Sequence, residues 1–589
     1  MKFSKLRNWD KEADIEGLLF FYQRTEELLF DYTLDSYKPK LLCSSLLCEE
    51  VLQTISEIRH ENLDKQNLKH LIPELETLIR SDPISKSLIP NDPAEYFKDT
   101  GKNYDDIDKL EARVQLLAKC LQPEVCIIYL KKFISKAVKD NKKKDIDSGI
   151  NQLVTLLLGY GYSKQFIFNE TKNFFRSRKI NDPKIVDTFL EKFTLDRKTY
   201  NCYFKATNII KDLDSRIQKF GCEQVDSLFD VIPKEKIPRK FQTISTDKTY
   251  IYAKDVIAMD VFSARENAEQ RLMFLSDLYS VFHHKTKIQW DDVSVVEDQK
   301  TKEISVANKE TNVLLRGIDM KSQKASQEFE NLLNKFTLIY HNEARFTFKE
   351  ALSLHGISLT TENAQNQLLN LWIAIETICP KKQSTSKIQS ITTSLTPILY
   401  VRYLRKLITN YVMDISRYKV SDIRDNIDKE IEDREDARLV SAFKILHHSE
   451  LASVRKSIYD QTDDFPLLRY RTYELQEKFK NKKSIKKLID AHIQKVSWQI
   501  HRIYRTRNLI VHSANKVQNV NYLAENTHSY LDSILDMTMR LSCSRYMLDD
   551  FNQIFEHSRL HMKKMEQILS GQEELTDKEI QALISMGIQ

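Results

Sequence analysis

Residues that interrupt regular structure are scarce in this chain. It has 10 glycines and 12 prolines among 589 residues, so few turn-forming positions separate its long periodic segments. In most of these segments apolar side chains recur at steps of three and four, the spacing that places them on one face of a helix. The sequence therefore predicts a mainly α fold, and the chain is long enough for several domains.

Changes in this pattern divide the chain into four predicted parts. Residues 1–204 are predicted to form a helical domain, and short β-rich runs around a helix at 263–282 predict a small α/β domain at 205–320. Helices resume in a third domain at 321–560, and residues 561–589 are predicted to be a helical tail with a weakly anchored end. The helices expected in the third domain span 329–353, 360–378, 386–412, 421–448, 484–510 and 522–547.

Composition limits the class of protein. The net charge of +6 is too small for a general nucleic-acid-coating field, so any RNA-binding surface must be local. No apolar run approaches the roughly 20 residues that cross a bilayer, and the N-terminus lacks the apolar core of a signal peptide. The eight cysteines form neither a C-x-x-C pair nor a zinc-finger spacing. We expect a soluble, cytoplasmic protein with reduced thiols, no cofactor, no bound metal and no membrane contact.

A short motif near the C-terminus carries the main functional signal. In the run from Arg507 through Asn508 to His512, the arginine can neutralise phosphate charge and the histidine can move a proton near neutral pH. Arg507 extends the apolar stripe of the helix at 484–510, and Asn508 and His512 share one helix face. Arg507 and His512 lie roughly 140° apart around a straight helix, so they converge only if the helix ends or bends between them. The polar residues 513–515 are a plausible end.

Positive charge is concentrated around this motif. Residues 471–516 contain twelve Lys or Arg and three Asp or Glu, which favours salt-sensitive attraction to a phosphate backbone. The expected RNA contacts are Arg505, Lys482, Lys483 and Lys486. The charge run at 139–145 is interpreted as a solvated helix end, and the glycine-tyrosine turn at 159–162 lacks the residues of a phosphate loop.

Two motifs in the right order resemble the HEPN superfamily, over about residues 325–550. Arg507, Asn508 and His512 fill its R-x4–6-H pattern with a polar residue after the arginine, and the segment from Leu368 to Glu376 is similar to the L-x-x-L-W-x-A-I-E helix of the Apea-like HEPN branch. The resemblance implies a helical bundle that dimerises through the motif helices, with both copies forming one cleft. It also implies a metal-independent endoribonuclease that leaves 2′,3′-cyclic phosphate and 5′-hydroxyl ends.

The resemblance further implies a toxin or anti-phage effector, activated by a phage-derived trigger or a regulatory partner. Ala514 stands where HEPN toxins paired with a nucleotidyltransferase carry a tyrosine, so we expect no control by that route. The segment from Asp260 to Ala264 also resembles segments that precede HEPN domains in bacterial defence proteins. The first 320 residues are the better candidates for sensing and restraint.

Several alternatives stay open on the sequence alone. The chain could be a HEPN-fold protein that holds RNA or another protein without cleaving it, or a structural adaptor of a larger defence complex. Glu376 could hold Arg507 near the cleft or pair with another nearby base, whereas Trp372 and Cys379 are expected in the core.

Overall fold

The computed structural model describes most of the chain. The described residues are 8–10, 13–30, 38, 40–98, 100, 104, 106–316, 320–340, 342–380, 386–418, 435–512, 519–571 and 573–588. Helices dominate these ranges and one small sheet interrupts them, which confirms the mainly α, multi-domain fold with a central α/β segment. Among the described helices, none combines the length and apolar character that a bilayer crossing requires.

The first part of the chain is a helical body built around α1. The residues from Gly17 onward in this helix are mostly buried, and three later helices of the body pack against it. Its helices are α1 (Glu16–Leu29), α2 (Ser44–Arg59), α3 (Leu68–Ser81), α4 (Pro83–Leu88), α5 (Ile107–Cys120), α6 (Pro123–Lys139), α7 (Lys143–Tyr160), α8 (Lys164–Arg176) and α9 (Ile185–Glu191).

The sheet of the α/β domain begins earlier in the sequence than predicted. It is antiparallel, with the order β2-β3-β1-β4-β5, and α11 (Val261–Ser280) packs against it. The strands are β1 (Lys198–Thr207), β2 (Cys222–Val225), β3 (Lys248–Ala258), β4 (Val293–Asp298) and β5 (Ile304–Asn308), with the short helix α10 (Arg239–Gln242) between β2 and β3. The predicted boundary at 204/205 therefore cuts through β1, the central strand. The buried residues Tyr200, Cys202, Phe204 and Ala206 alternate along β1 and line one of its faces, so the period-two pattern of a strand continues across the predicted boundary.

The last part of the chain is a second helical body, which contains the motif helix α20. Its helices are α12 (Ser322–Lys335), α13 (Asn342–Thr360), α14 (Ala364–Ile378), α15 (Lys387–Tyr418), α17 (Glu435–His447), α18 (Ala452–Gln461), α19 (Pro466–Phe479), α20 (Lys482–His512), α21 (Val520–Ser542), α22 (Phe551–Ser570) and α23 (Asp577–Ile584). The helix expected at 329–353 is two helices, α12 and α13. The first half of the charged helix expected at 421–448 lies outside the described residues.

The predicted tail at 561–589 is an integral part of this body. α22 continues unbroken across residue 561, and α23 buries Ile580, Leu583 and Ile584 against α15 and α17. A capping box between Thr576 and Glu579 fixes the start of α23. The prediction of a weakly anchored appendage is therefore wrong, because the apolar face of α23 has a partner that lies far away in the sequence.

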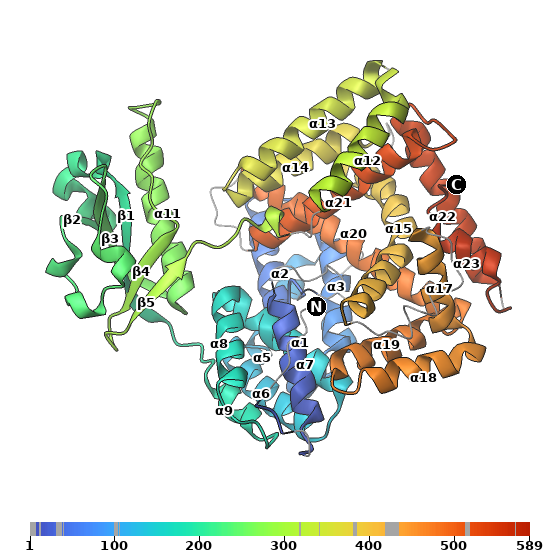
Figure 1. Cartoon of the computed structure of the whole chain (residues 1–589), viewed down its shortest axis with the longest axis horizontal. Coiled ribbons are helices and arrows are strands. Elements are labelled where there is room, and N and C mark those ends of the chain that lie inside the picture. The colour runs from blue at the N-terminus through green and yellow to red at the C-terminus, as the bar shows by residue number, and fades with distance from the viewer. Residues whose placement is uncertain are drawn as a thin grey trace.

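The two helical bodies share core residues and lie against each other, whereas the α/β domain stands to one side (Figure 1). Phe465, Leu467, Leu468 and Leu509 complete the core of the first body. Between the bodies, Arg471 lies 2.7 Å from both Glu27 and Asp414, and all three side chains are buried. This junction brings α2 and α3 beside α20.

Candidate functional site

The motif helix continues without a break through both predicted catalytic residues. α20 runs from Lys482 to His512, so no bend or helix end separates Arg507 from His512. In one chain the two side chains therefore leave the helix roughly 140° apart. His512 is the last residue of α20 and is exposed, and Arg507 is half-buried. Residues 513–515 lie outside the described residues.

Arg507 keeps much of its hydrogen-bonding capacity. Its Nη1 donates to Asn508 Oδ1 at 3.2 Å, which places the polar residue of the motif directly against the guanidinium. Within the described ranges, its Nε is buried without a hydrogen-bond partner, and no carboxylate pairs with the side chain. A half-buried guanidinium in this condition can accept an anionic ligand.

The neighbouring arginine Arg505, an expected RNA contact, is already paired. Its Nη2 lies 2.7 Å from Glu50 on α2, and the residue is only 4% exposed. Arg502 contacts Glu50 at 2.9 Å and Glu74 on α3 at 2.6 Å. Burial alone would raise the pKa of Glu50, but Arg502 and Arg505 outweigh it and hold that pKa below its usual value. Arg505 thus joins the two helical bodies, and RNA cannot reach it in this arrangement.

Two further contacts hold the motif half of α20 against the first body. The imidazole rings of His501 and His70, on α3, stack with their centroids 3.4 Å apart. Burial, together with the nearby His70 and Arg505, lowers the pKa of His501 to about 3. Leu509, inside the motif itself, belongs to the core of the first body. The sequence carried no signal that pairs α20 with α2 and α3, because these segments are more than 400 residues apart.

The predicted lysine contacts lie at the opposite end of α20. Lys482 is buried and lies 3.0 Å from Glu579 at the start of α23, so it is not a free surface charge. Lys483 and Lys486 are exposed. The rise of roughly 1.5 Å per residue places them about 30–45 Å along the helix from the motif. The structure therefore does not bring the lysines and the motif together within one chain.

Of the two alternatives for Glu376, the structure shows pairing with a nearby base other than Arg507. Its carboxylate accepts hydrogen bonds from Trp372 Nε1 at 2.6 Å and Lys387 Nζ at 2.7 Å. Trp372 is buried, as expected, and its ring lies 6.0 Å from that of Tyr504 on α20. Cys379 is also buried, as expected. Trp372 on α14 thus packs against the motif helix α20, and the carboxylate of Glu376 is not available to Arg507.

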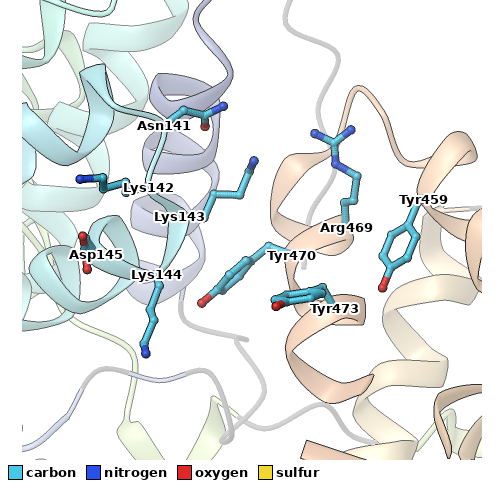
Figure 2. A pocket seen from close by; sticks show the side chains of 9 residues that line it. All are labelled: Asn141, Lys142, Lys143, Lys144, Asp145, Tyr459, Arg469, Tyr470 and Tyr473. Carbon is cyan, nitrogen blue, oxygen red and sulfur yellow. The ribbon is translucent and has the colours of Figure 1, made fainter. Parts of the chain in front are cut away.

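A cavity of about 600 Å³ lies at a different place on the junction of the two bodies. Figure 2 shows lysines at the start of α7 on one side, and Arg469 with three tyrosines of α18 and α19 on the other. Lys143 and Arg469 both pair with Glu16, whereas Lys144 is exposed. A solvated helix end was expected for the charge run at 139–145, but part of this run lies at the junction of the two bodies. Three of its lysines pair with carboxylates of the same chain, Lys139 with Asp187, Lys142 with Asp140 and Lys143 with Glu16.

One cluster of metal-ligating side chains occurs among the described residues, although the sequence showed none. His355 on α13 lies beside His528 and Asp532 on α21. The spacing of His528 and Asp532, one helical turn apart, was visible in the sequence. The third member is 173 residues away from His528, and only the tertiary structure identifies it.

No family model, curated protein or solved structure matches this chain. The resemblance to the HEPN superfamily therefore rests on the two motifs of the sequence, and the functional conclusion rests on the residues themselves.

Proposed function

We propose that this chain is a metal-independent endoribonuclease of the HEPN type, and that two copies form its active site. The observation that carries the proposal is the state of Arg507. Of the three arginines in the last three turns of α20, Arg502 and Arg505 are paired with carboxylates, whereas the side chain of Arg507 hydrogen-bonds to Asn508 and to no carboxylate among the described residues. An exposed histidine ends the same helix. Phosphodiester cleavage requires an available guanidinium and a proton-transferring group, and the end of this helix carries both.

The proposed reaction is attack of an RNA 2′-hydroxyl on its own 3′-phosphate. The O2′–P bond forms and the P–O5′ bond breaks, which leaves a 2′,3′-cyclic phosphate and a 5′-hydroxyl. One His512 accepts the proton of the 2′-hydroxyl, and a second His512 gives a proton to the departing O5′. Arg507 stabilises the charge on the pentacoordinate phosphorus, and Asn508 orients Arg507 through its hydrogen bond.

The geometry of α20 favours a dimer for this chemistry. Arg507 and His512 diverge on one straight helix, so Arg507 of one copy and His512 of the other are the natural pair. A twofold axis beside the end of α20 would build two equivalent half-sites in one cleft. The expected substrate is cellular or phage RNA in the cytoplasm, cleaved after a phage-derived or other trigger.

The first helical body fits the role of restraint in this scheme. It holds the motif half of α20 through Glu50, Glu74, His70 and the packing of Leu509. A shift of α2 and α3 relative to α20 would move the motif directly. This contact favours a regulated nuclease over the alternative of a structural adaptor of a larger defence complex in which residues 1–320 do the work.

The decisive experiment follows RNA ends in vitro and in cells. Purified full-length chain is incubated with total RNA in EDTA, and 5′-hydroxyl ends are sequenced there and after induction in a bacterial host. Arg507→Ala and His512→Ala should each lower cleavage at least 100-fold, since each removes a group that acts in the transition state. His284→Ala, an exposed histidine of the α/β domain, is the matched control and should cleave normally.

Two outcomes would contradict this proposal. Equal cleavage by wild type and His512→Ala would show that the activity arises elsewhere. Tight RNA binding without new 5′-hydroxyl ends, in vitro and after induction, would favour the alternative function of a non-catalytic RNA- or protein-binding component.

A further inference from the structure

His355, His528 and Asp532 bring three potential metal ligands together from two helices. His355 Nε2 lies 3.0 Å from His528 Nε2 and 3.3 Å from Asp532 Oδ1. One ligand atom from each of the three residues can be chosen so that all lie within 4.8 Å of one another. The cluster is separate from the proposed nuclease site, because its members lie on α13 and α21 and none belongs to α20.

The local structure holds these side chains in place. His528 and Asp532 are one turn apart on α21, so they share one face of that helix, and His528 Nδ1 lies 3.5 Å from Asp532 Oδ2. α14 packs against both α13 and α21 (Figure 1), and the contact of His355 with His528 shows that His355 lies opposite this face. Both histidines are half-buried, and the side chain of Asp532 is 50% exposed.

The close approach of two ring nitrogens has a specific chemical meaning. A neutral imidazole carries one N–H, so two Nε2 atoms 3.0 Å apart either share one proton or direct two lone pairs toward the same place. Tetrahedral coordination with bonds of about 2.0–2.1 Å places ligand atoms roughly 3.3 Å apart. The distances of 3.0 and 3.3 Å within the cluster are close to this spacing.

We infer that His355, His528 and Asp532 bind a divalent first-row transition-metal cation of the Zn²⁺ class. Two imidazoles and one carboxylate suit Zn²⁺, Co²⁺ or Ni²⁺, whereas Mg²⁺ and Ca²⁺ prefer all-oxygen sites. The exposed position of Asp532 leaves the remaining coordination position to water. This inference replaces the expectation of no bound metal.

The cation would act as a bridge between α13 and α21. α21 is the described helix that follows the motif helix α20, so the bridge would tie α13 to the helix that comes after the motif. The bridge is independent of the proposed nuclease, which uses no metal in its chemistry. A failure of metal binding would therefore leave the nuclease proposal standing, and a failure of RNA cleavage would leave the metal site standing.

Equilibrium binding tests the site directly. Full-length, tag-free chain is stripped with EDTA, dialysed, and titrated with Zn²⁺ by calorimetry and with Co²⁺ by visible absorption. We expect one equivalent with a dissociation constant in the micromolar range or below, the visible bands of four-coordinate Co²⁺, and a higher unfolding midpoint with Zn²⁺. His355→Ala should weaken binding at least 100-fold and remove both the Co²⁺ bands and the shift in midpoint.

Two further variants separate ligation from folding. His528→Gln and Asp532→Asn preserve side-chain size and should also weaken binding, with helical circular dichroism in EDTA equal to wild type. His284→Ala, an exposed histidine far from the cluster in sequence, should bind as wild type does. The inference is overturned if wild type binds neither cation below about 100 µM, or if a His355→Ala/His528→Gln double variant retains the full equivalent.

Discussion

Three arginines in six positions of α20 have three different environments. Arg502 is shared by Glu50 and Glu74, Arg505 belongs to Glu50, and Arg507 contacts its own neighbour Asn508. Their sequence spacing alone does not distinguish them. The difference arises because Arg502 and Arg505 face α2 and α3, whose carboxylates neutralise them, whereas Arg507 lies beyond the reach of these acids.

The first prediction concerns Glu50. Glu50→Gln leaves Arg505 without its carboxylate and Arg502 with only Glu74, in a buried setting. Removing one partner of a buried ion pair leaves an uncompensated charge, so we expect a loss of about 3–5 kcal/mol in the free energy of unfolding. Urea denaturation followed by circular dichroism measures this change.

Glu49→Gln is the matched control for this change, because the side chain of Glu49 is exposed one position away on the same helix. It should alter stability by less than about 0.5 kcal/mol. A loss of similar size in both variants would show that the Glu50 pairs contribute little. Under the proposed function, Glu50→Gln should also raise basal RNA cleavage, since it loosens α2 from the motif helix.

At the scale of elements, the contact between α3 and α20 depends on neutral histidines. His70 and His501 stack face to face, with Arg505 nearby, and burial holds the pKa of each ring below its usual value. A proton added to either ring would place a cation against the other ring and against Arg505. This arrangement makes the junction sensitive to mild acid.

The second prediction is therefore a loss of stability as the pH falls below about 6.5. The pKa of His501 is about 3 in the folded chain and near 6.5 when unfolded, so in this window the unfolded chain binds a proton that the folded chain does not. Stability is fully present above pH 6.5 and declines toward pH 3. His492 and His561, with pKa values lowered by burial to about 3 and about 4, act in the same direction.

The measurement is the unfolding midpoint between pH 7 and pH 5, where most carboxylates stay ionised. His501→Phe keeps a flat ring against His70 and removes one titrating group, and His501 Nε2 has no hydrogen-bond partner among the described residues that would be lost. The variant should show a shallower fall than wild type. An identical slope in both proteins would exclude His501 as a source of the pH dependence.

The sequence predicts that α23 is a helix, but it does not predict which helices α23 packs against. The spacing of Ile580, Leu583 and Ile584 is visible in the sequence and marks one apolar helix face. The partner helices α15 and α17 begin more than 130 residues earlier. Local pattern therefore predicted a helix correctly and an appendage wrongly.

At the scale of the whole molecule, the α/β domain has hydrophobic cores of its own, whereas the two helical bodies share core residues. The α/β domain has two hydrophobic cores made only of residues between 200 and 307. Asp260 ties it to the first helical body by accepting hydrogen bonds from Ser163 N and Oγ at 2.7 and 2.8 Å. The two helical bodies, by contrast, share core side chains and the buried Glu27–Arg471–Asp414 group.

The third prediction follows from this contrast. A fragment of residues 196–316 should fold alone, with a β-containing circular dichroism spectrum and one cooperative thermal transition, because its cores are complete. A fragment of residues 321–589 should lack a cooperative transition, since it exposes Phe465, Leu467, Leu468 and Leu509 and leaves Arg471 without Glu27. The reverse result, in which only the second fragment folds, would contradict the described division of the cores.

The sequence by itself determined the mainly α class, most helix positions and the Arg507–Asn508–His512 motif. These features depend on local spacing, on the scarcity of glycine and proline, and on side-chain chemistry, which all act within a few residues. The end of α14 before Pro380 and the extent of α20 are of this kind.

Only the tertiary structure decided which charged groups are available. It paired Arg505 with Glu50, buried Lys482 against Glu579, assigned Glu376 to Trp372 and Lys387, and brought His355 to His528 and Asp532. All of these contacts join different helices, apart from the hydrogen bond between Trp372 and Glu376, which lie one turn apart on α14. Periodicity specifies which face of a helix is apolar, but it does not specify which distant helix covers that face and brings its charges into range.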